Sequence, residues 1–189
     1  MAEEIIGDVT RWDISAADLP ERVVTAPSGG RVFLLPDSRV DGVAVYRDDV
    51  AGLVKTLRHR GVDIDFACGR EDRRYLSEYG ATAVVATIGI AVATTLTTDL
   101  VKSIVLAAWQ RARSSLGPGC PAEEVEEARV TVKIAEIVRT ENETVVRGFE
   151  ITGRLADIDN LVQFAVSDST LAELPSAGRD DAAPENNTG

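Results

Sequence analysis

The sequence predicts an α+β domain: a small mixed sheet with a long central apolar helical segment, a C-terminal β-hairpin and a closing helix. Three observations predict it. Hydrophobic residues change from strand-like alternation to helical spacing and back between Val43 and Ala67. The stretch from Gly80 to Thr98 carries no charge, and the chain stays largely apolar as far as Trp109. Two β-rich runs near the C-terminus pair in one register that matches apolar and charged residues together.

Short strands precede the first helix. Residues 31–35 and 43–46 are rich in β-formers and are bounded by Pro, Gly and an Asp-Gly turn, which predicts two strands. Residues 48–60 carry Val and Leu at helical spacing, with Asp at the start and Gly61 after the last basic residue. This pattern predicts an amphipathic helix whose basic end suits the negative end of the helix dipole.

The segment after that helix alternates again. Residues 62–67 predict a strand, and its parallel pairing with residues 43–46 would obey the right-handed crossover rule. Residues 71–79 predict a short polar helix that ends at Gly80.

The apolar stretch from Gly80 to Trp109 allows three interpretations: a buried core, a surface that docks a partner, or a membrane segment. Its helical spacing predicts two consecutive helices, the second starting near Thr98 and Asp99. Abundant Thr and the lack of basic flanks argue against a membrane span, although the length would just suffice. Small side chains favour close packing, with self-association as one outcome. The candidate interaction residues are Val85, Ile88, Val92, Leu96, Leu100, Ile104 and Trp109.

The C-terminal runs, residues 130–138 and 145–151, predict a hairpin closed by residues 140–143. The expected register pairs Arg139 with Thr144, Ile134 with Phe149, Val132 with Ile151, Lys133 with Glu150 and Glu136 with Arg147. A slip by one residue would destroy every match. If its face is covered, Glu136 and Arg147 form a buried ion pair; a bulge that turns Glu136 outward is the alternative.

The ends of the chain differ from its middle. Residues 157–165 predict a closing helix, and the polar segment beyond Leu174 has no apolar periodicity. We therefore expect an acidic extension at 1–22, a single α+β domain at 23–172 and a disordered acidic tail at 173–189.

Composition restricts the function. The chain has 189 residues and a formal net charge of −11, and its basic residues form only brief clusters, which argues against nucleic-acid binding. The two cysteines, Cys68 and Cys120, stand far apart, and the acidic start resembles no signal peptide. We expect a cytoplasmic protein with free thiols.

No familiar catalytic or phosphate-binding motif occurs, so we assign no catalytic residue, no metal ligand and no cofactor. His59, the sole histidine, lies between two arginines and suits a helix end better than a general base. Asp63 and Asp65 share a strand face and could hold Mg²⁺, and Cys68 follows that strand. A small-ligand or metal-dependent enzyme built on these three residues therefore remains an alternative.

Within residues 50–165, the segment VVATIGIAVATTLTTDLVKSIVLAAWQRAR is followed by RVTVKIAEIV and VVRGFEITGRLADIDNLV. This layout resembles that of the effector-associated constant component proteins of bacterial conflict and defence systems. It implies a non-enzymatic adaptor that works through a protein partner, and it transfers no catalytic residue. Our leading hypothesis is a protein-interaction module, with membrane association through residues 80–109 as the alternative.

Overall fold

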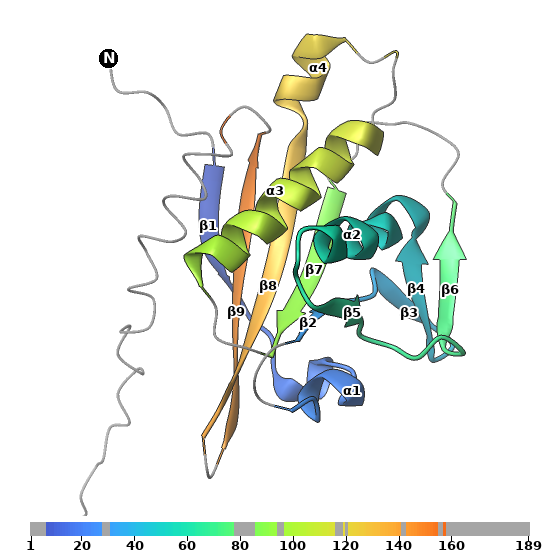
Figure 1. The fold of residues 1–189 in the computed structure, drawn as a ribbon, viewed down its shortest axis with the longest axis vertical. Coiled ribbons are helices and arrows are strands. Elements are labelled where there is room, and N and C mark those ends of the chain that lie inside the picture. Colours follow the sequence, from blue (N-terminus) through green and yellow to red (C-terminus); the bar gives the residue numbers. More distant parts are fainter. Residues whose placement is uncertain are drawn as a thin grey trace, which may run out of the picture.

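The structure is a computed structural model and describes residues 7–27, 31–77, 86–93, 97–115, 119, 121–140, 143–154 and 157. Strands and helices follow one another along the chain (Figure 1). The strands are β1 (Gly7–Trp12), β2 (Val32–Leu34), β3 (Ser38–Val40), β4 (Val43–Arg47), β5 (Ile64–Phe66), β6 (Arg73–Leu76), β7 (Ala86–Val92), β8 (Arg129–Arg139) and β9 (Thr144–Arg154). The helices are the 3-10 turn η1 (Ala16–Asp18), α1 (Glu21–Val24), α2 (Asp48–His59), α3 (Thr98–Ser115) and α4 (Ala122–Glu127).

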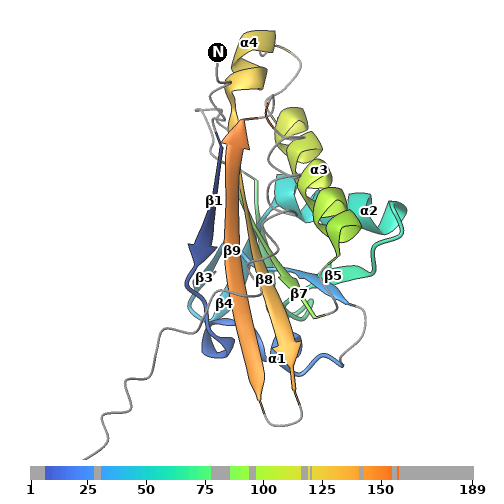
Figure 2. The same ribbon diagram turned by 90° about the vertical axis from the view of Figure 1, so that its left-hand side faces the viewer.

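The strands form two sheets. The larger has the order β1-β9-β8-β7-β2-β5, and the smaller has the order β3-β4-β6. Both are mixed. In the larger sheet, β7 pairs with β8 and β2 pairs with β5 in parallel, while β1 pairs with β9, β8 with β9 and β2 with β7 antiparallel. In the smaller sheet, β4 pairs antiparallel with β3 and in parallel with β6. Helices α2 and α3 lie on one face of the larger sheet, and α1 lies at one end of the other face (Figure 2). The predicted α+β class with a small mixed sheet is confirmed.

The hairpin forms in the expected register. β8 and β9 pair Ile134 with Phe149 and Lys133 with Glu150, and the remaining predicted pairs follow along the strands. The Lys133 Nζ atom lies 3.1 Å from Glu150 Oε2. Local alternation and cross-strand charge matching were sufficient to predict the register of this hairpin, because the two strands are joined by a short turn.

The first half of the apolar stretch is a strand, so the expectation of two helices was wrong for residues 86–92. β7 lies in the middle of the larger sheet, between β8 and β2. Ile88, Ile90 and Val92 face the helices, while Ala91 packs on the opposite side, so both faces are covered. A strand buried on both faces is a continuous apolar run without alternation, and such a run is also compatible with helical spacing.

Two other expectations were wrong. Residues 73–76, expected in a polar helix, form strand β6, which pairs in parallel with β4. The strand expected to pair with residues 43–46 is β5, and it pairs instead with β2. Helix α2 therefore connects the two sheets instead of crossing within one, a choice that local spacing does not specify.

The N-terminal segment belongs to the folded domain from Gly7 onward. β1 pairs along its whole length with β9 at the edge of the larger sheet, and Leu19 is buried. The boundary expected at residue 22 therefore does not separate an extension from the fold. The closing helix expected at 157–165 falls, apart from Asp157, outside the described residues, as do the tail at 173–189 and Cys120.

Two apolar clusters form the core, one on each face of the larger sheet. Between the sheet and helices α2 and α3 lie Ile88, Val92, Ile104 and Trp109, all at most 1% exposed. These candidate interaction residues are thus core side chains, because β7 is central and α3 packs over it. Leu100 is half-buried against the same cluster, and Val85 and Leu96 fall outside the described residues.

Within the described part of the chain, the helices are too short or too polar to cross a bilayer.

Candidate functional site

Polar side chains follow each other across the sheet face opposite α2 and α3. Thr87, Thr131 and Thr152 stand in register on β7, β8 and β9, and the hydroxyl oxygens of Thr131 and Thr152 lie 2.9 Å apart. The next row along the strands contains Gly89, Lys133, Glu150 and Thr10. Alternation along each strand puts these residues on one face, away from the helices.

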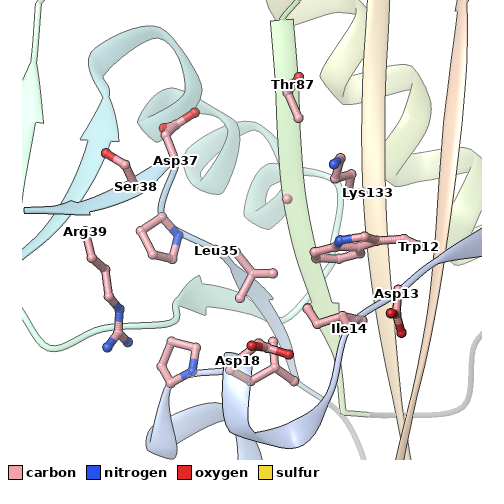
Figure 3. A pocket seen from close by; sticks show the side chains of 14 residues that line it. Trp12, Asp13, Ile14, Asp18, Leu35, Asp37, Ser38, Arg39, Thr87 and Lys133 are labelled. Carbon is pink, nitrogen blue, oxygen red and sulfur yellow. The ribbon is translucent and has the colours of Figure 1, made fainter.

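A groove of about 440 Å³ opens on this polar face, beside Thr87, Gly89 and Lys133. Its lining comes from three places that are distant in sequence: the end of β1 with the β1–α1 connection, the β2–β3 connection with the start of β3, and the strands β7 and β8. Figure 3 shows Leu35, from the β2–β3 connection, near the centre of the lining, with Trp12 on one side and Asp37 and Arg39 on the other. The lining residues are Trp12, Asp13, Ile14, Asp18, Leu19, Pro20, Leu35, Pro36, Asp37, Ser38, Arg39, Thr87, Gly89 and Lys133.

Trp12 forms one side of the groove, and the sheet fixes its place. It ends β1 opposite Gly148 of β9, where a Cβ would lie only 2.2 Å from the Trp12 carbonyl oxygen. The missing side chain at position 148 thus allows the close approach of the two backbones. Above the indole ring, Lys133 Nζ lies 5.5 Å from the ring centroid while also pairing with Glu150. This is the geometry of a cation–π contact.

The opposite side of the groove follows β2. Asp37 Oδ2 accepts a hydrogen bond of 3.0 Å from the Arg47 amide, and Asp37 Oδ1 lies 3.3 Å from Arg47 Nε. Burial raises the pKa of Asp37, and the Arg47 amide and guanidinium oppose that shift. The Arg47 guanidinium also donates to the Thr87 carbonyl at 3.2 Å, which ties this side to β7.

The floor of the groove is Gly89 on β7. A Cβ there would lie 3.2 Å from the Leu35 Cβ, so a glycine leaves room for the leucine to pack on the strand. Because Gly89 has no side chain, the floor of the groove next to Leu35 and Lys133 is bare backbone.

Asp18 lies on the Trp12 side and caps the 3-10 turn. Its Oδ2 atom accepts hydrogen bonds from the Ser15 hydroxyl at 2.6 Å and from the Ser15 amide at 2.8 Å. These bonds lower the pKa of Asp18, so the carboxylate carries its charge at neutral pH. Asp13 lies on the same connection and is exposed.

The residues proposed for an enzyme are engaged in other contacts. Asp65 Oδ2 lies 2.6 Å from an Arg22 nitrogen and its Oδ1 lies 3.2 Å from an Arg58 nitrogen, while Asp63 pairs with Arg31 at 3.3 Å. In the portion of the chain that the structure describes, no group of three His, Cys, Asp or Glu side chains could hold a metal ion. Asp65 of strand β5 and Asp63 just before it each pair with arginines.

Cys68 is buried in the core cluster, and its amide donates to the Tyr46 hydroxyl at 3.3 Å. Arg39 approaches the Cys68 sulfur at 4.0 Å. Burial, followed by the neighbouring Cys68, raises the pKa of Tyr46, which keeps its hydroxyl protonated. His59 is exposed in the last turn of α2, as a helix-end role requires.

The pair Glu136 and Arg147 has the expected register but is not buried. Arg147 is exposed and Glu136 is partly exposed, although both lie on the helix-facing side of the hairpin. The described helices cover that face only as far as Ile134, so the outer end of the hairpin reaches solvent.

The network around Asp65 makes stability dependent on pH. Burial opposes the ionisation of Asp65, but the Phe66 amide, Arg22 and Arg58 outweigh it and hold its pKa below the ordinary value. A carboxylate with a lowered folded-state pKa stabilises the fold above its unfolded-state pKa of about 3.9, and this stabilisation disappears as pH falls through the folded-state value.

Asp65→Asn is therefore expected to lower the free energy of unfolding by about 1 kcal/mol at neutral pH, and by progressively less below about pH 4. Urea denaturation across that pH range measures it. Asp63→Asn is the matched control, because the Asp63 pair is more exposed, and it should change stability little at any pH. An Asp65→Asn effect that does not vary with pH would contradict the explanation.

The groove was not predicted from the sequence. Its three parts come together only when β1 joins β9 and β2 joins β7, and neither pairing has a local signal. The one hint in the sequence was a tryptophan, Trp12, close to Asp8, Asp13 and Asp18, and it lay in the segment expected to be an extension.

Comparison with known proteins finds no matching family model, no matching curated protein and no matching solved structure.

Proposed function

We propose that this chain is a protein-interaction module, a non-enzymatic adaptor that binds a segment of a protein partner in the groove beside Trp12. The adaptor role is the one implied by the resemblance to effector-associated constant component proteins, and a bacterial conflict system is the setting we propose. A cytoplasmic location suits the reduced, buried Cys68.

One observation carries the proposal: the groove combines an apolar interior with a charged border. Trp12, Ile14 and Leu35 supply the apolar surface, and Asp37 and Arg39 stand at the rim. Interfaces between proteins share this anatomy, with an aromatic anchor at the centre and polar groups around it. The groove is also rigidly held, because strand pairing fixes Trp12 and the Arg47 contacts fix the opposite side. Rigid sites lose less conformational entropy on binding.

Thr87→Tyr tests this function. Thr87 is exposed on β7 and lines the groove, so a tyrosine there would occupy the groove without disturbing the core. The tagged chain is co-expressed with the products of the neighbouring genes, and complexes are isolated and sized by gel filtration. We expect a complex with the original chain, its loss with Thr87→Tyr, and an unchanged melting temperature.

Thr144→Tyr is the matched control, because Thr144 is also exposed on a strand but lies outside the groove lining. It should bind like the original chain. A dimer that Thr87→Tyr abolishes would identify the partner as a second copy. A complex that survives Thr87→Tyr would contradict binding in the groove, and the absence of any complex would contradict the adaptor role.

A further inference from the structure

Among the residues that the structure describes, some of the charged side chains that line the groove are neutralised by an ion-pair partner, and others are not. Asp37 is matched by Arg47, whose side chain contacts it directly, and Lys133 is matched by Glu150 at 3.1 Å. Both pairs are partly buried, so each largely neutralises itself before a partner arrives. These four residues therefore contribute shape more than net charge.

The remaining charges differ between the two sides. On the Trp12 side, Asp13 and Asp18 are both exposed, and Asp18 is held ionised by Ser15. On the opposite side stands Arg39, which is exposed and approaches the Cys68 sulfur. The Trp12 side is thus the acidic side of the groove, next to its apolar surface.

The whole chain reinforces this local preference. With a formal net charge of −11, its field attracts cationic groups and repels acidic ones during association. The Trp12 indole already accepts one cation, the Lys133 ammonium, on its face. A long basic side chain offers both features that the site lacks: an aliphatic stem for the apolar surface and a charged end for the carboxylates.

We propose that the groove binds a basic segment of a protein partner, with a Lys or Arg side chain lying along Trp12 and Ile14 and its charge directed to Asp13 and Asp18. This inference rests on the proposed adaptor function and names the chemistry of its partner. Shape and the aromatic anchor provide the contact, and the acidic side provides the selection for a basic segment.

Two synthetic peptides of about ten residues test the charge preference, one alternating Lys with Val and the other alternating Glu with Val. Trp12 reports binding by fluorescence, since the other tryptophan, Trp109, is only 1% exposed, and Trp12→Phe supplies the background signal. We expect the Lys peptide to bind at least about tenfold more tightly than the Glu peptide. Its affinity should fall several-fold as ionic strength rises from about 0.05 M to about 0.5 M.

The double variant Asp13→Asn/Asp18→Asn separates the groove from the general charge. Asparagine keeps an acceptor oxygen for Ser15, so the 3-10 turn stays capped. The control Glu123→Gln/Glu143→Gln removes the same two charges at exposed positions outside the groove lining. We expect the groove variant to weaken Lys-peptide binding about fivefold or more and the control to change it less than about twofold.

Equal weakening by both double variants would overturn the proposal, because the attraction would then be general. Tighter binding of the Glu peptide would also overturn it. If that Glu-peptide binding were lost in Thr87→Tyr, the groove would still dock a segment and only the basic preference would fail. Binding of neither peptide, together with no complex in the co-expression experiment, would remove both proposals.

Discussion

Gly148→Ala is expected to lower the free energy of unfolding by about 3 kcal/mol. A Cβ at this position would lie 2.2 Å from the Trp12 carbonyl oxygen and 2.7 Å from the Ile14 Cγ2 atom. The first of these is backbone, which no rotamer change can move away. The strand pair β1–β9 would have to separate locally, and with it the Trp12 side of the groove would shift.

Urea denaturation measures the loss, and fluorescence of Trp12 reports the displacement. Gly119→Ala is the control, because a Cβ there would meet nothing within 4 Å. It should leave stability close to the original value. If Gly148→Ala were as stable as Gly119→Ala, the close approach of Trp12 to β9 would be wrong, and the groove would lose its fixed side.

Trp109→Ala is expected to lower the free energy of unfolding by about 3–5 kcal/mol, the usual range for removing a large buried aromatic side chain. Trp109 is 1% exposed and lies in the core cluster between α3, α2 and the sheet. The measurement also decides between two interpretations of the apolar segment. If α3 presented this residue to a partner, the isolated chain would lose little stability on its truncation.

Trp109→Phe should cost much less, about 1–2 kcal/mol, because phenylalanine fills most of the space. The indole Nε1 of Trp109 has no hydrogen-bond partner in the described structure, so its removal sacrifices no bond. Equal stability of the alanine and phenylalanine variants would contradict core packing at this position.

Local sequence patterns were sufficient to predict those elements whose contacting residues are also close in sequence. The β8–β9 hairpin formed in its predicted register, down to Lys133 opposite Glu150, because one short turn sets the alignment of both strands. Helix α2 formed where residues 48–60 predicted it, since its acidic first turn, its basic last turn and its apolar face belong to one segment. Both elements are specified by interactions that a window of a few residues contains.

Such local patterns could not predict the groove or the strand β7. Ile90 lies in an apolar run whose spacing is also compatible with a helix. In the structure it pairs with Leu34 on one strand and with Ile134 on another. Trp12 likewise lines a site only because β1 pairs with β9, near the other end of the chain. Backbone hydrogen bonds to distant strands outweigh a weak local preference for helix in an apolar run.

The sequence by itself determined the α+β class, the amphipathic helix, the hairpin and the acidic character of the protein, because periodicity, turn residues and charge are properties of short segments. Only the tertiary structure decided that the apolar stretch divides into a central strand and a helix, and that Trp12, Leu35 and Asp37 surround one groove. Those outcomes depend on which strands exchange hydrogen bonds across the chain, and that choice is made by burial of the whole sheet rather than by any one segment.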